Sequence, residues 1–197
     1  MSKLANKVAL VTGGSRGIGA AIAKRLAADG ASVAITYAKD ADAAEAVVKA
    51  IGFAGIKAIA IRADAANAEA VRAAVEKTVA TFGRLDVLVN NAGTAIPKPF
   101  EEATLDEMDR VLDINIRGVF AAPQAALKHM KDGGRIIMIG SGGRRASGCA
   151  RACALRGHEG GRQDVYPGAF QRGRKPWHHR QQRPAGSDRY GLKSRVG

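Results

Sequence analysis

Residues 7–141 alternate between short apolar runs rich in β-branched residues and longer stretches rich in alanine. The apolar runs are "KVALVTGG", "ASVAITYA", "IKAIAIRA", "LDVLVNNAG" and "GRIIMIGS". Strands that are apolar on both sides, alternating with helices, are typical of a parallel sheet covered on both faces. The pattern therefore predicts an α/β fold with five parallel strands.

The alanine-rich stretches carry recognisable helix signals. Asp40 and Asn67 each stand just before such a stretch, where a side-chain oxygen can cap the first turn. Thr104 precedes Glu107 by three residues, the spacing of a capping box. The helical pattern that follows runs past Pro123, so we expect one long helix with a bend near the proline, or two short helices.

Composition changes abruptly after Ser141. Residues 1–141 hold 18 Lys and Arg against 15 Asp and Glu, whereas residues 142–197, the basic tail, hold 13 against 3. The basic tail has eleven Gly and eleven Arg but only two Val, two Leu and no Ile, so it can bury little apolar surface. We expect one folded α/β domain over residues 1–141 and an irregular or disordered segment over residues 142–197.

The first strand leads into "TGGSRGIG", in which Gly13, Gly17 and Gly19 are spaced G-x-x-x-G-x-G. A strand that turns tightly into a helix leaves backbone N–H groups unpaired, and glycine lets a pyrophosphate approach them. The loop therefore predicts a dinucleotide site. A glycine-rich turn that only packs helix on strand is the alternative.

This glycine spacing resembles the short-chain dehydrogenase/reductase family, as do "NNAG" at 90–93, "DINIRGVF" at 113–120 and "RIIMIGS" at 135–141. Within the family the sequence looks most like the 3-oxoacyl-acyl-carrier-protein reductases. The resemblance implies a Rossmann-type doubly wound sheet, here truncated after the fifth strand. It also implies transfer of a hydride between NAD(P) and a carbonyl, on an acyl thioester or another small ketone, by a homo-oligomer whose interface elements are missing here.

The choice of cofactor is predicted from the end of the second strand. The resemblance places an acidic residue there in NAD-preferring members, but this chain has Tyr37. Arg16 in the glycine loop could pair with a 2′-phosphate, so NADP(H) is favoured over NAD(H), although Arg16 could also be a solvated surface residue. Asp64 matches a position that binds the adenine amino group; its other role would be to cap the next helix, and the two roles are compatible. The cofactor residues implied by the resemblance are Gly13, Ser15, Arg16, Gly17, Ile18, Gly19, Tyr37, Asp64, Ala65, Asn91, Ala92 and Gly93.

Two catalytic residues are implied by the same resemblance. Asn115 falls in mid-helix, where asparagine is a poor helix former, and the family uses it in a kinked helix that binds a proton-relaying water. Ser141 ends the fifth strand, where the family places a hydroxyl that hydrogen-bonds the substrate carbonyl. Alternatively, the Ser141 hydroxyl would hydrogen-bond to groups of its own loop. Asn90 is expected to tie neighbouring strands together.

The family's catalytic tyrosine and lysine, spaced Y-x-x-x-K, are absent. About a dozen residues after Ser141 the chain has Leu155. Tyr166 is followed by a proline, which opposes a helix, and has no lysine in reach. Tyr190 precedes Lys193 by three residues and lies too late in the chain. We therefore expect a catalytically impaired polypeptide.

A shift of reading frame explains the gap. If translation starts one base later within each codon, codons that can encode "LRGHEGG" can also encode Y-A-A-M-K-A. This reading puts a tyrosine at position 155. The same offset turns "WHHRQQRPAGSDRYGLKS" into G-I-T-V-N-N-V-Q-P-G-P-I-D-T-D-L-N-P, which looks like the family's sixth strand and following loop. We infer a frameshift between Ser141 and about Cys149.

The frameshift also accounts for features that imitate other functions. The histidines and cysteines of the basic tail, Cys149, Cys153, His158, His178 and His179, do not make a convincing zinc site, so we expect no metal. A non-catalytic dinucleotide-binding protein whose basic tail contacts nucleic acid or an acidic partner is the alternative function, ranked below the reductase. No apolar segment is long enough for a membrane span and no signal region begins the chain, so we expect a cytoplasmic protein.

Overall fold

The computed structural model describes residues 2–140, whose strands form one parallel sheet in the order β3-β2-β1-β4-β5. The strands are β1 (Val8–Val11), β2 (Ser32–Tyr37), β3 (Ala58–Arg62), β4 (Val87–Asn90) and β5 (Arg135–Met138). The helices are α1 (Gly17–Ala28), α2 (Ala41–Gly52), α3 (Ala68–Phe82), α4 (Leu105–Leu112) and α5 (Gly118–Ala126), with a 3-10 turn η1 (Phe100–Glu102) and a π-helical turn η2 (Asp113–Arg117).

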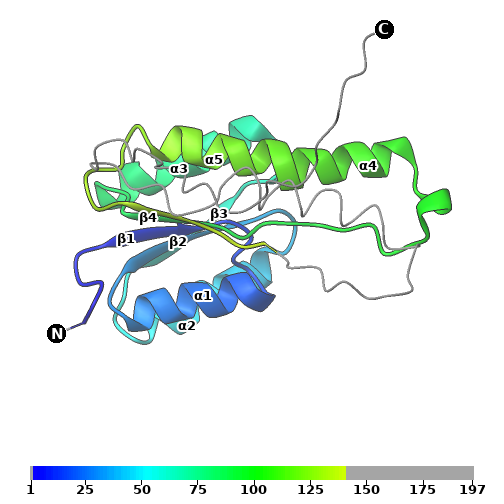
Figure 1. The fold of residues 1–197 in the computed structure, drawn as a ribbon. Coiled ribbons are helices and arrows are strands. Elements are labelled where there is room, and N and C mark those ends of the chain that lie inside the picture. Colours follow the sequence, from blue (N-terminus) through cyan, green and yellow to red (C-terminus); the bar gives the residue numbers. More distant parts are fainter. Residues whose placement is uncertain (1, 141–197) are drawn as a thin grey trace, which may run out of the picture.

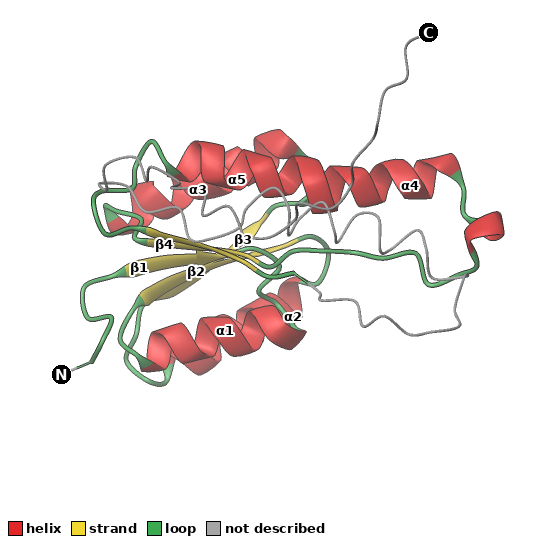
Figure 2. Cartoon of the chain, viewed as in Figure 1, coloured by secondary structure: helices red, strands yellow, loops and turns green. Residues whose placement is uncertain are grey.

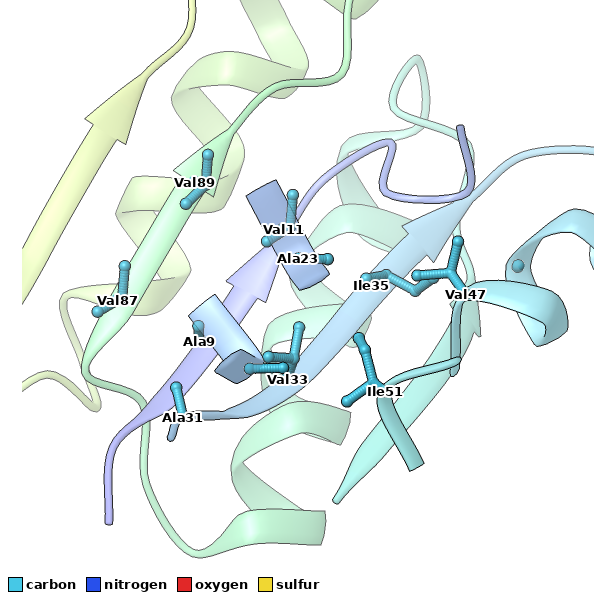
Figure 3. Close-up of a cluster of buried hydrophobic side chains, with 12 residues drawn as sticks. Ala9, Val11, Ala23, Ala31, Val33, Ile35, Val47, Ile51, Val87 and Val89 are labelled. Carbon is cyan, nitrogen blue, oxygen red and sulfur yellow. The ribbon is translucent and has the colours of Figure 1, made fainter. Parts of the chain in front are cut away.

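The helices cover both faces of the sheet. Helices α1 and α2 lie on one face, and α3 and α5 lie on the other (Figure 1, Figure 2). Strand β1 is buried on both sides: Ala9 and Val11 pack in the cluster under α1 and α2, and Leu10 packs in the opposite cluster. Figure 3 shows the first cluster, in which Val11 lies near Ala23. Burial on both faces explains why these strands are continuous apolar runs.

The strand order confirms the expected doubly wound sheet. From the central β1 the chain moves through β2 to β3 on one side, and from β4 to β5 on the other. The order reverses between β1 and β4, and ligands of such sheets bind outside the carboxyl ends of the strands at that point. The glycine loop follows β1 and "NNAG" begins at the end of β4, so both predicted motifs lie at this crevice.

The helix signals were also predicted correctly. The side chains of Asp40 and Asn67 cap α2 and α3, and Thr104 and Glu107 form a complete capping box at the start of α4. The irregular turn of the long helix is η2, however, which comes before Pro123 rather than at it. Pro123 lies inside α5, and the helix continues on both sides of it.

The predicted domain boundary after Ser141 lies outside the described residues. No helix within residues 2–140 has the length and apolar character required to cross a membrane.

Candidate dinucleotide-binding site

The glycine loop between β1 and α1 is tightly held against the end of β2. Gly13 has a φ of +64°, and its N–H donates to Thr36 Oγ1 at 3.0 Å. The N–H of Gly14 donates to the Thr36 carbonyl at 2.9 Å. A Cβ on Gly19 would lie 2.3 Å from the Gly13 carbonyl oxygen, so only glycine allows α1 to start this close to the turn.

The first turn of α1 is open toward solvent. Arg16 at the N-cap is extended and its side chain makes no capping hydrogen bond. Gly17 has a φ of +54° and an added Cβ there would meet no atom within 4 Å. Ile18 is 66% exposed, an unusual position for a large apolar side chain. Uncapped N–H groups and the positive end of the helix dipole together favour an anion such as a pyrophosphate.

The end of β2 carries no carboxylate, and exposed Lys39 follows it. Tyr37 ends the strand and is half-buried, and Arg16 and Lys39 are exposed. Neither cation forms an ion pair with another described residue. The nearest acid along the chain, Asp40, caps α2 by accepting the Ala43 N–H at 2.9 Å. Because β2 ends on Tyr37 and not on a carboxylate, the strand end itself carries no negative charge that would repel an added phosphate.

Asp64 lies just beyond β3, where it makes two hydrogen bonds. Its Oδ1 accepts the Ala66 N–H at 3.0 Å, and its Oδ2 accepts Nη2 of Arg110, also at 3.0 Å. Burial acts to raise the pKa of Asp64, but these hydrogen bonds and the charges of Arg110 and Lys39 outweigh it, so the pKa lies below the ordinary 3.8. The alternative role as a helix cap is wrong, because Asn67 caps α3.

"NNAG" is bound to the glycine loop through Thr12. Thr12 Oγ1 accepts the N–H groups of Asn91 and Ala92, both at 3.0 Å. Asn91 Nδ2 donates in return to the carbonyls of Thr12, at 2.9 Å, and of Gly13, at 3.1 Å. These bonds join the carboxyl ends of β1 and β4 and place Ala92 and the exposed Gly93 at the crevice.

Asn115 lies in η2, only 5% exposed, and fastens the helix to the loop after β4. Its Oδ1 accepts the Thr94 N–H at 3.0 Å and its Nδ2 donates to the Thr94 carbonyl at 2.8 Å. Lys98 Nζ, farther along the same loop, lies 2.7 Å from Glu107 Oε2 of α4. A buried amide with both groups paired to one backbone residue is a rigid support, and it explains why asparagine occurs inside this helix.

The structure thus brings together all the predicted cofactor residues and Asn115 around the ends of β1 to β4. Ser141, Tyr166, Tyr190 and the cysteines of the basic tail lie outside the described residues. The part of the chain that is described contains no group of three or more His, Cys, Asp or Glu side chains suited to a metal ion.

Sequence reasoning missed three residues of this region. Thr12 and Thr36 hold the glycine loop, and Arg110 holds Asp64. Thr12 could have been predicted from the sequence, since it is the threonine of the T-G-x-x-x-G-x-G motif. Thr36 and Arg110 act on residues 23 and 46 positions away, and no local pattern marks such pairs.

These features fit a dinucleotide. The glycine turn at Gly19 leaves no room for a side chain, the start of α1 is uncapped, and Arg16 and Lys39 are exposed. Fold and site together define a dinucleotide-binding α/β protein. Residues 7–152 match the short chain dehydrogenase family, and the chain belongs to that family.

Relatives of the chain agree with this assignment. It is 55% identical over 141 residues to an uncharacterized oxidoreductase of Methylorubrum extorquens, a match that covers 72% of this chain and 57% of the relative. It is 44% identical over 159 residues to elsinochrome reductase 1 of Elsinoe fawcettii, covering 81% and 60%. A short chain dehydrogenase of Burkholderia cenocepacia, solved in complex with NADP, superposes with a TM-score of 0.79 at 49% identity, covering 83% of this chain and 66% of that one. The chain therefore spans about three-fifths of the curated relatives' length.

Proposed function

We propose that this chain is the NADP(H)-binding part of a carbonyl reductase of the short-chain dehydrogenase family. One observation carries the proposal: the open, uncapped start of α1 carries exposed Arg16, and β2 ends on Tyr37, followed by exposed Lys39, rather than on a carboxylate. A carboxylate at that edge would repel a 2′-phosphate, whereas a guanidinium attracts one. The NADP complex of the Burkholderia relative supports the same choice of cofactor.

Each part of the crevice would hold one part of the cofactor. The glycine loop and Ile18 would bind the pyrophosphate through backbone N–H groups, and Arg16, with Tyr37, would hold the phosphorylated ribose. Asp64 and Ala65 would contact the adenine, and Asn91 to Gly93 would contact the nicotinamide ribose. Asn115 would keep a relay water in place, and Ser141 would hydrogen-bond the substrate carbonyl.

The reaction itself requires a hydride and a proton. Bound NADPH would supply the hydride to the carbonyl carbon of a 3-oxoacyl thioester or similar ketone. The family's tyrosine would donate the proton to the carbonyl oxygen, but positions 155 and 159 hold Leu155 and Glu159. Positioned acid catalysis contributes about 10²–10⁴-fold in rate, so the chain as written should bind cofactor and reduce substrate very slowly or not at all. We infer a frameshift as the cause.

Binding and turnover test the two halves of this proposal separately. NADPH fluorescence is titrated with the purified 197-residue chain, with NADH as the comparison, and NADPH oxidation is followed with a 3-oxoacyl thioester. The same assays are run on a chain whose reading frame is restored after Ser141. We expect NADPH binding in both and turnover only in the restored chain. Failure of both to bind NADPH would refute the cofactor assignment, and turnover by the original chain would refute the impairment.

A further inference from the structure

The loop that follows β3 is held at two consecutive residues by the α4–α5 helix. Arg110 of α4 donates Nη2 to Asp64 Oδ2 at 3.0 Å. One residue farther, the Ala65 carbonyl oxygen lies so close to Gly118 that a Cβ on this glycine would be 2.2 Å from it. The helix backbone therefore packs directly on the loop at Ala65, and the Arg110 side chain contacts the loop at Asp64.

The ion pair contributes little to stability. The Arg110 and Asp64 side chains are 50% and 39% exposed, and water screens the attraction between charges this exposed. A conformational role is more consistent with the contacts. The Ala66 N–H fixes Oδ1, and Arg110 fixes Oδ2, so the plane of the carboxylate has one orientation. Each oxygen keeps a second lone pair that can accept a hydrogen bond.

A fixed, ionised carboxylate discriminates between purine rings. It accepts a hydrogen bond from an exocyclic amino group, as on adenine, but it repels the carbonyl oxygen that hypoxanthine carries at the same position. The discrimination depends on the orientation of the carboxylate, because a rotated or mobile carboxylate can turn its oxygens away from either ring.

We propose that Arg110 is a positioning residue that orients the Asp64 carboxylate toward the adenine amino group and so sets the selectivity for adenine over hypoxanthine. The inference rests on the proposed function, since it assumes that the adenine of NADP(H) lies against Asp64. It adds a residue of α4, 46 positions away along the chain, to the cofactor site.

The test measures dissociation constants of NADPH and of its hypoxanthine analogue, deamino-NADPH, by fluorescence with the complete chain. Arg110→Met keeps the apolar stem and removes the guanidinium. It should weaken NADPH binding about fivefold, the loss of roughly one hydrogen bond, and change deamino-NADPH binding less than twofold. Arg110→Lys should recover part of the selectivity. Arg117→Met is the control, because Arg117 pairs with Asp113 in the same long helix without touching Asp64.

Circular dichroism monitors the folding of every sample. A second variant tests whether Arg110 acts through Asp64. Asp64→Asn removes the charge that Arg110 orients, so adding Arg110→Met to it should change NADPH affinity no further. Equal weakening of both nucleotides by Arg110→Met would mean that Arg110 contacts the cofactor directly, and would overturn the inference, as would no change in either. If the unmodified chain binds neither nucleotide, the proposed function fails and the inference fails with it.

Discussion

The side-chain amide of Asn90, at the end of β4, donates a hydrogen bond of 3.1 Å to the carbonyl oxygen of Val119 in α5. In a regular α-helix that carbonyl would accept the N–H of the residue four positions later, which here is Pro123 and has no N–H. Asn90 is only 2% exposed, so the bond is shielded from water. A strand residue thus supplies the donor that the helix lacks, which explains how α5 continues through its proline.

Replacement of Asn90 by alanine should lower the free energy of unfolding by about 1–3 kcal/mol, because it leaves the Val119 carbonyl buried without a donor. Pro123→Ala supplies a new N–H to the same carbonyl, so Asn90→Ala should cost much less in that background. Urea unfolding of the unmodified chain, the two single variants and the double variant gives the coupling, and the cycle cancels the effect of proline on the unfolded chain. Strictly additive losses would contradict this pairing.

Gly19→Ala should reduce NADPH affinity at least about tenfold. Its Cβ would lie 2.3 Å from the Gly13 carbonyl oxygen and 2.5 Å from Asn91 Nδ2, so the turn must move and its N–H groups with it. Gly52→Ala at the end of α2 is the matched control, since an added Cβ there meets no atom within 4 Å. Fluorescence titration measures the affinity. An unchanged affinity in Gly19→Ala would show that this turn does not hold the cofactor.

The elements that sequence reasoning predicted are those with local causes. A cap such as Asp40 or Asn67 bonds an N–H two or three residues away, and a buried parallel strand is apolar throughout, so both are visible in a short window. The glycine loop is also local, because its shape depends on positive φ at Gly13 and Gly17.

Features that depend on tertiary contacts were not predictable in this way. The helix was expected to bend near Pro123, yet the irregular turn surrounds Asn115, whose partner Thr94 is 21 residues away. The bond from Asn90 to Val119, 29 residues apart, removes the reason for a break at the proline. Alternation of apolar and polar residues cannot indicate such contacts.

Arg16→Ala should weaken NADPH binding about tenfold and leave NADH binding nearly unchanged, because the guanidinium is expected to pair only with the 2′-phosphate. The difference should shrink as salt is raised, since Arg16 is exposed and its charge is screened. Lys24→Ala removes a charge from the exposed side of α1 and controls for the general field of the protein. Competition between the two nucleotides at low and high salt provides the measurement. Equal losses for NADPH and NADH would assign Arg16 to another part of the cofactor.

The stability of the fold should fall in acid through Asp86, which lies at the opposite, amino-terminal edge of the sheet. Burial acts to raise the pKa of Asp86, but hydrogen bonds from Arg84, the Val8 N–H and Lys7 outweigh it and lower the pKa below 3.8. A lowered pKa means that the stabilisation is complete above 3.8 and is lost as the pH falls through the value of the folded state. Asp86→Asn should therefore be less stable than the unmodified chain at neutral pH, and the difference should disappear in strong acid. Urea unfolding from about pH 2 to pH 7 checks this, with Asp132→Asn, an exposed carboxylate that pairs with no described residue, as the control. Other acid-sensitive groups cancel in the comparison, so a pH-independent difference would show that the carboxylate charge of Asp86 does not stabilise the fold.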